Sequence, residues 1–165
     1  MYSNLLGGKP FIGLMMGISV SNISCKSDPG SIWKDGHSGK PIVVVSGYSG
    51  TNGTNHVAKY WLNGQETALS NGTNDAYANS IVVNGSDIYI AGTDAVPVYW
   101  QNNTETKLSI KSTYGAASSV CVSGNNVYIA GNDSSKAVFW KDGTETILDN
   151  VTDSGSSGTS VCISG

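Results

Sequence analysis

The stretch SIVVNGSDIYIAGTDAVPVYWQNNTETKL, residues 80–108, decides the fold of this chain, because a close copy follows it. The copy, SVCVSGNNVYIAGNDSSKAVFWKDGTETIL, occupies residues 119–148. In both, two apolar runs flank a short turn, and an aromatic pair and a Glu-Thr-x-Leu segment come after them. Asn, Asp and Gly tolerate positive φ and favour the tight turns that join antiparallel strands. Each copy therefore predicts four short antiparallel strands.

Partial copies on both sides extend the repeat over residues 42–165. Residues 42–69 match the last three strands of the unit, and residues 158–164 match its first strand. Four antiparallel strands repeated about every 40–45 residues are typical of the blades of a β-propeller. We therefore expect an all-β fold, a partial β-propeller of four-stranded antiparallel blades, with roughly three blades and a lone strand.

The composition agrees with an all-β fold and excludes other classes. Charged residues make up 13% of the 165 residues, about half the usual share, whereas helical bundles and coiled coils are rich in Glu, Lys and Arg. There are 9 Lys and Arg against 12 Asp and Glu, for a formal net charge of −3. Because binding to phosphates needs a basic surface, nucleic acid is not an expected partner.

The repeated positions suggest packing roles for most of the chemically notable side chains. We expect the aromatic pairs ending in Trp61, Trp100 and Trp140, spaced 39 and 40 residues apart, to pack between blades. Cys121 and Cys162 stand where another copy has valine, so we expect inert thiols. The two histidines lie in polar loops, and no Cys/His cluster is present, so no cofactor or metal is expected. The carboxylates that recur on the fourth strand are expected to be solvated edge charges; they are Glu66, Glu105 and Glu145.

Residues 1–25 have the pattern of an export signal. The apolar run Phe11–Val20 is too short to cross a bilayer but has the length of a signal peptide's apolar region. Ser24-Cys25 resembles a bacterial lipobox, which implies lipidation of Cys25 and a membrane contact through a lipid anchor alone. A plain secretory signal and a buried first strand are the alternatives. We expect an extracytoplasmic protein, in the bacterial periplasm or at the cell surface, with residues 26–41 as a linker.

The repeats resemble kelch-type blades. They are more similar to the Tyr-Trp-x-Asn-Gly repeats, related to HAF repeats, of secreted bacterial proteins, many of them lipoproteins. The resemblance rests on the aromatic pair Tyr60-Trp61, the turn Asn63-Gly64 and the strand Ile88–Gly92. The chain departs from kelch repeats because the glycine doublet is reduced to Ala91-Gly92 and because Tyr and Trp are adjacent. The resemblance therefore implies a propeller fold and no kelch function.

The candidate binding residues lie in loops. In a propeller, the loops after the second strand and those before the first strand of each blade share one face, which is where we expect a glycan or protein ligand. The residues singled out there are Tyr48, Asn74, Asp75, Tyr77, Asp94, Tyr114 and Asp133.

No catalytic constellation is present, so we expect a non-enzymatic protein that binds or scaffolds. One alternative is a fragment of a propeller enzyme acting on glycans, a glycosidase or lyase, to which Asp75, Asp94 or Asp133 supplies a carboxylate. A structural array without a ligand is another. Three blades are too few for a typical closed propeller. The chain is therefore expected either to be a fragment or to self-associate through its open edge.

Overall fold

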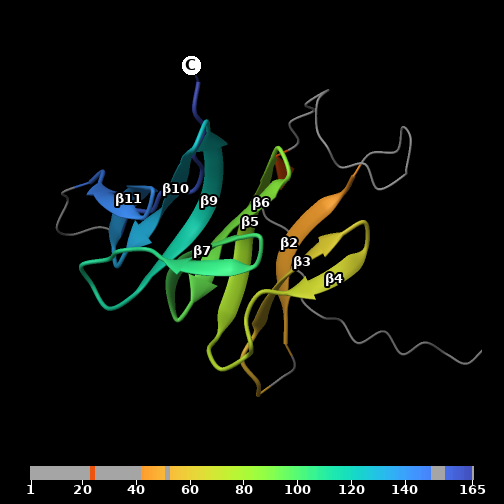
Figure 1. The fold of residues 1–165 in the computed structure, drawn as a ribbon. Helices are drawn as coiled ribbons and strands as arrows, with labels where there is room; N and C mark the ends of the chain where they lie inside the picture. Colours follow the sequence, from red (N-terminus) through yellow and green to blue (C-terminus); the bar gives the residue numbers. More distant parts are fainter. Residues whose placement is uncertain (1–22, 25–41, 51–52, 150–154, 165) are drawn as a thin grey trace, which may run out of the picture.

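The computed structural model describes residues 23–24, 42–50, 53–149 and 155–164. These residues form an all-β structure of twelve strands in three sheets (Figure 1). No helix in this part of the chain is long and apolar enough to cross a bilayer. Cys25, the linker at residues 26–41 and all of the proposed signal segment except Ile23 and Ser24 lie outside the described residues.

Each sheet is built from neighbours in sequence that run antiparallel. The first contains β2 (Val44–Ser49), β3 (Val57–Leu62) and β4 (Gln65–Ala68). The second contains β5 (Ala76–Asn84), β6 (Asp87–Asp94), β7 (Val96–Gln101) and β8 (Thr104–Lys107). The third contains β9 (Gly115–Ser123), β10 (Asn126–Asp133), β11 (Lys136–Lys141) and β12 (Thr144–Ile147). The two-residue β1 (Ile23–Ser24) pairs parallel with β5.

This arrangement confirms the predicted strand order and an all-β class. The described residues contain two four-stranded sheets and one of three strands, and these do not close into a ring. The register is the same in all three sheets, because each tryptophan lies opposite an apolar residue on one side and a glutamate on the other. The three sets are Val45, Trp61 and Glu66; Ile90, Trp100 and Glu105; and Ile129, Trp140 and Glu145.

The core consists of two apolar clusters between successive sheets. Trp100 is fully buried in a cluster that includes Ala58 and has Tyr60 of the first sheet packed against it. Trp140 is fully buried in a second cluster, against which Tyr99 of the second sheet packs. Adjacent residues of a strand point to opposite faces of a sheet. Trp100 and Trp140 therefore pack toward the preceding sheet, whereas Tyr60 and Tyr99 pack toward the following one. The prediction that the aromatic pairs pack between units is confirmed for these four residues.

Two glycines allow the inner strand of a sheet to bend over the tryptophan. The pairing of β5 with β6 shifts between Ala78 and Ser80, beside Gly92. A Cβ at Gly92 would meet the carbonyl oxygen of Tyr77 and lie 2.7 Å from Cζ3 of Trp100. Gly131 is in the same situation in the third sheet, between Ala116 and Trp140. The second residue of the Ala-Gly pair is therefore required by a close approach of backbone and indole.

The turn between the last two strands also follows one design. Asn102 has a φ of 48°, and its Oδ1 accepts a hydrogen bond from the backbone nitrogen of Ile88 at 3.0 Å. Asp142, with a φ of 50°, accepts in the same way from Val127 at 2.8 Å. Each side chain thus ties the turn to the start of the second strand, which explains the preference for Asn or Asp there.

Residues 155–164 lie extended against the third sheet. The backbone nitrogen of Gly158 donates to the carbonyl of Gly131 at 2.8 Å, and that of Val161 donates to Ser119 Oγ at 3.3 Å. The same bond joins Val120 to Ser80 at 3.2 Å, between the inner strands of the second and third sheets. The segment therefore lies where the repeat predicts the first strand of a next unit. It has no strand partner among the described residues, so the predicted lone strand is an extended segment rather than part of a sheet.

Candidate functional site

Three polar contacts join the end of the second strand of a sheet, or the loop after it, to a loop that precedes a first strand, either of the next sheet or of the same sheet. They link His56 to Asp75, Asn74 to Asp94, and Ser112 to Asp133. The two sets of loops thus meet at one end of the sheets, and the candidate residues divide into three groups, one at each contact.

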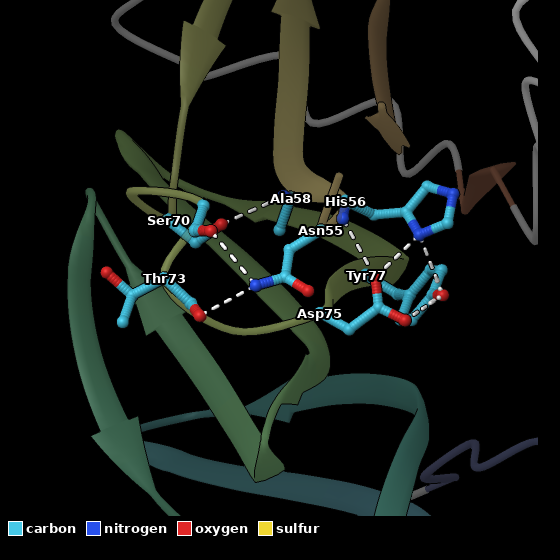
Figure 2. A network of polar contacts seen from close by, with 8 residues as sticks. Asn55, His56, Ala58, Ser70, Thr73, Asp75 and Tyr77 are labelled. Carbon is cyan, nitrogen blue, oxygen red and sulfur yellow. Dashed lines mark hydrogen bonds and ion pairs between the residues drawn. The ribbon is translucent and has the colours of Figure 1, made fainter. Parts of the chain in front are cut away.

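The first group, the His56 cluster, consists of Tyr48, His56, Asp75 and Tyr77. One oxygen of Asp75, Oδ1, lies 2.6 Å from His56 Nδ1 and accepts the His56 backbone N–H at 2.8 Å. The other, Oδ2, accepts the Tyr77 hydroxyl at 2.7 Å (Figure 2). The carboxylate of Asp75 therefore holds both rings in place.

The hydrogen bonds determine which nitrogen of His56 carries the proton. The Tyr77 hydroxyl donates to Asp75, so its oxygen, which lies 2.9 Å from His56 Nδ1, is an acceptor toward the imidazole. Nδ1 thus faces two acceptors and must be the protonated nitrogen. Figure 2 shows the other ring nitrogen, Nε2, pointing away from Asp75 and Tyr77. The imidazole therefore presents Nε2 to a ligand.

Three rings of the cluster pack edge to face or tilted. The ring centroid of Tyr48 lies 4.9 Å from that of His56 and 4.7 Å from that of Tyr77, both in edge-on geometry. The centroids of His56 and Tyr77 are 5.0 Å apart. The side chains of His56 and Asp75 are 36% and 53% exposed. The cluster is therefore a preformed aromatic and anionic surface that solvent reaches.

The same contacts shift two pKa values in opposite directions. The His56 backbone N–H, followed by the Tyr77 hydroxyl and the His56 ring, lowers the pKa of Asp75 to about 2. The hydrogen bond to Asp75, with burial, raises the pKa of Tyr77 to about 12. Near neutral pH, Asp75 is therefore an anion and Tyr77 a neutral phenol.

Polar side chains next to the cluster hold its two loops together. The side-chain amide of Asn55 donates to the carbonyls of Gly72 and Thr73, at 3.2 and 2.7 Å. Ser70 Oγ accepts the backbone N–H of Ala58 at 3.0 Å (Figure 2). The loop that leads into β5 is thereby fixed to the loop that leads into β3, and this positions His56 beside Asp75.

The second group is smaller. The Asn74 side-chain amide donates to Asp94 Oδ1 at 2.8 Å, which ties the loop before β5 to the end of β6 in the same sheet. Asp94 precedes Ala95, whose φ of 59° marks the tight turn between β6 and β7. Burial, together with the negative charge of Asp94, raises the pKa of Glu105. These residues link the loops but bring no ring together with the carboxylate.

The third group places Asp133 inside the protein. Asp133 is only 4% exposed. Its carboxylate accepts hydrogen bonds from the backbone N–H of Lys111 at 2.8 Å, from the backbone N–H of Ser112 at 3.2 Å and from the Ser112 hydroxyl. Tyr114 is 59% exposed, and its hydroxyl accepts a hydrogen bond from Ser134 at 2.8 Å. Asp133 therefore clamps the loop between β8 and β9, whereas Tyr114 remains open to solvent.

Glu145 corrects the prediction that the recurring glutamates are solvated edge charges. Its side chain is 4% exposed, because Ser109 covers it: Ser109 Oγ accepts the Glu145 backbone N–H, and the Ser109 carbonyl accepts the Trp140 indole N–H. Glu145 Oε1 has no hydrogen-bond donor among the described residues, and Lys111 Nζ lies 3.7 Å from Oε2. Glu66 agrees better with the prediction, since its side chain is 48% exposed and pairs with Lys59 at 2.6 Å.

The buried Glu145 and Asp133 have opposite protonation preferences. Burial, and then the nearby Asp133, raises the pKa of Glu145. Burial also acts to raise the pKa of Asp133, but hydrogen bonds from Ser112 and the Lys111 backbone outweigh it and lower that pKa. The folded protein therefore favours the protonated form of Glu145 more than an exposed glutamate does, and it favours the ionised form of Asp133.

Metal ligands do not gather in the described ranges, where no three His, Cys, Asp or Glu side chains are arranged to hold an ion. Cys121 is a half-buried free thiol, and Cys162 is an exposed one.

Comparison with known proteins adds no family. The sequence matches no protein-family model, and no curated protein matches it.

The residue that the sequence interpretation missed is His56. Sequence alone places it in a solvated loop, although its loop also follows Tyr48 and thus belongs to the expected ligand face. The available signal is the repeat itself, since it assigns the loop of His56 and the loop of Asp75 to the same end of neighbouring sheets. Their contact spans 19 residues of sequence, and His56 follows an insertion that the other units lack.

Proposed function

We propose that this chain is part of an extracytoplasmic, non-enzymatic β-propeller repeat protein that binds a carbohydrate at the His56 cluster. The identical register of the three sheets and their side-by-side packing through aromatic pairs support blades of a propeller. The lipobox-like Ser24-Cys25 supports a lipid-anchored or secreted location.

The observation that carries the binding proposal is the convergence of three rings on an ionised carboxylate. Aromatic faces and edges provide apolar contact area that the C–H surfaces of a sugar ring match. Asp75, an acceptor only, binds sugar hydroxyl groups, and His56 Nε2 adds a second polar contact. Binding sites commonly combine such aromatic walls with a few convergent polar groups.

Glycan-array binding, followed by calorimetry on the best ligand, tests this function. Tyr48→Ala removes one ring, and Asp75→Asn removes the anion that holds His56 and Tyr77. We expect each to weaken the affinity at least tenfold, because both alter the preformed surface. Tyr114→Ala is the matched control, since Tyr114 is an exposed tyrosine at the same end of the sheets but lies outside the cluster.

Three results would contradict the proposal. They are an array on which no glycan binds the wild-type chain, equal losses in the Tyr114→Ala control, and binding that survives both cluster substitutions. Circular dichroism and thermal unfolding of each variant separate a loss of binding from a loss of fold.

The Asp75–His56 contact favours a second candidate, acid–base chemistry on a glycan. A carboxylate that orients Nδ1–H of a histidine leaves Nε2 as a base, which a lyase needs to remove a proton from its substrate. Cleavage of the bound glycan would select this function over binding alone, provided that the cleavage is lost in His56→Gln and retained in Tyr114→Ala.

A further inference from the structure

In the part of the chain that the structure describes, the first sheet has no counterpart of the inner strands β5 and β9. In the second and third sheets, β5 and β9 pair with β6 and β10. The strand of the first sheet that corresponds to β6 and β10 is β2, and among the described residues it pairs only with β3. The other edge of β2 therefore has no strand partner among the described residues, and an open strand edge is a template for an added strand.

Residues 158–164 are the complement of this edge, because they have the sequence of an inner strand but no strand partner among the described residues. Their sequence repeats the inner strand, and Val161 makes the same bond to Ser119 that Val120 makes to Ser80. The segment is nevertheless not hydrogen-bonded to any strand as a ladder, and Cys162 and Ile163 are exposed. It is thus an inner strand, already placed on the third sheet, without an outer neighbour.

These two elements do not meet within one copy of the chain. The first sheet and the C-terminal segment lie on opposite sides of the second sheet (Figure 1). The sheet order in space follows the sequence, because β5 contacts β2 and β3, and β9 contacts β5, β6 and β7. Within the described residues of one copy, neither element therefore serves as the strand partner of the other.

We propose that residues 158–164 of one copy pair antiparallel with β2 of a second copy and complete its first sheet. The register follows from the existing pairs, in which Ile81 lies opposite Ile90 and Val120 opposite Ile129. Val45 takes the place of Ile90 and Ile129, because it lies opposite Trp61. Val161 therefore pairs with Val45, and Cys162 with Val44.

The aromatic faces support the same contact. At both junctions within the chain, the tyrosine face of one sheet packs on the tryptophan face of the next. The two faces left over are the Phe139 side of the third sheet and the Trp61 side of the first, which are again the two complementary types. Trp61 is only half-buried, whereas Trp100 and Trp140 are fully buried. A second copy that pairs through its C-terminal segment brings these faces together and continues the existing kind of interface.

Disulfide trapping tests the pairing and its register. In a chain with Cys25→Ser and Cys121→Ser, Val44→Cys is placed opposite the native Cys162, and oxidation is followed by non-reducing electrophoresis and mass spectrometry. A second variant, Val45→Cys with Val161→Cys and Cys162→Ser, probes the adjacent pair, because neighbouring antiparallel pairs alternate between wide and narrow spacing. We expect at least one variant to form a covalent dimer through the designed pair in more than half of its chains.

Gln65→Cys in the same background is the matched control, since Gln65 is an exposed residue on the opposite edge of the same sheet. It should give little dimer. A disulfide within one chain, or cross-linking no greater than that of Gln65→Cys, would overturn the proposal.

Light scattering on the unsubstituted chain provides a measurement independent of the variants. We expect a dimer at micromolar concentration that becomes monomeric when residues 158–165 are deleted. A wild-type chain that stays monomeric across this range, or a dimer that survives the deletion, would contradict the proposed pairing.

Discussion

Asp75 accepts hydrogen bonds from three donors, and only Tyr77 lies near it in sequence. Loop chemistry and the repeat predicted Asp75, Tyr77 and Tyr48 as site residues, because they fall in the two kinds of loop that share a face. The contact with His56 was not predictable, because His56 and Asp75 are 19 residues apart and the other units have no histidine at the corresponding position. Asp133 had the same sequence signature as Asp94 but is buried by the loop above it. Position in a repeat thus predicts which end of the sheet a side chain occupies, but its exposure depends on neighbouring loops.

Glu145 makes the stability of the protein depend on pH. Its raised pKa means that the folded state favours the protonated carboxyl over the unfolded state. This contribution is complete below the ordinary pKa of 4.5 and is lost as the pH rises through the raised value. Glu145→Gln keeps a neutral side chain of the same shape, so we expect it to unfold with a higher free energy than the wild type at pH 8. The advantage should approach about 1.4 kcal/mol for each pH unit by which the pKa is raised.

Urea unfolding of both proteins between pH 4.5 and pH 8 measures this difference. Glu66→Gln is the control, because its side chain is half-exposed and paired with Lys59. A gap between Glu145→Gln and wild type that stays constant over this range would show that Glu145 is ionised in the folded protein.

At the scale of the strands, most of the fold was predictable, because alternating apolar runs and Asn-Gly or Asp-Gly turns carry local signals. The inner strands begin at Ala76 and Gly115, four residues before the apolar repeats that start at Ser80 and Ser119, since small residues let the strand continue past the bulge. The pairing of β1 with β5 was not predicted. A two-residue parallel strand has no periodicity to detect, and its partner is distant in sequence.

Gly92 is the element-scale position at which a single methyl group should matter most. Gly92→Ala drives a Cβ into the Tyr77 carbonyl and the Trp100 ring, both held by the buried junction between β5 and β6. We expect a loss of ~3 kcal/mol in the free energy of unfolding, the upper part of the usual range for overpacking. Urea unfolding followed by tryptophan fluorescence measures the loss.

Gly155→Ala is the comparison for that substitution, because a Cβ at Gly155 meets nothing within 4 Å. It should change the stability by less than about 0.5 kcal/mol, as is usual for surface positions. Equal effects of the two substitutions would show that the crowding around Gly92 is relieved without cost.

At the scale of the whole molecule, stability should vary from sheet to sheet. Among the described strands, the main contacts between sheets join neighbouring sheets, as in repeat proteins whose stability is a sum of unit and junction terms. The second sheet has a neighbour on both sides, whereas β2–β4 has one. We expect the amides of β6 and β7 to exchange most slowly with deuterium and those of β4 most quickly.

Hydrogen exchange followed by mass spectrometry, at a concentration where the chain is monomeric, measures this gradient. Uniform protection across the three sheets would mean that the chain unfolds as one cooperative unit. At higher concentration, slower exchange confined to β2 and residues 158–164 would locate the contact with a second copy.

The curvature of the whole row was beyond prediction from sequence, because local patterns determine a sheet and its contacts with its neighbours but not the angle at which sheets follow one another. The tryptophan side and the tyrosine or phenylalanine side of each sheet nevertheless have a broad consequence. Every junction uses the same two surfaces, so a tandem duplication or loss of one unit in the gene leaves all remaining junctions chemically matched. Such a protein can change length by recombination between its own repeats and acquire a new loop each time, while the older loops keep their shape.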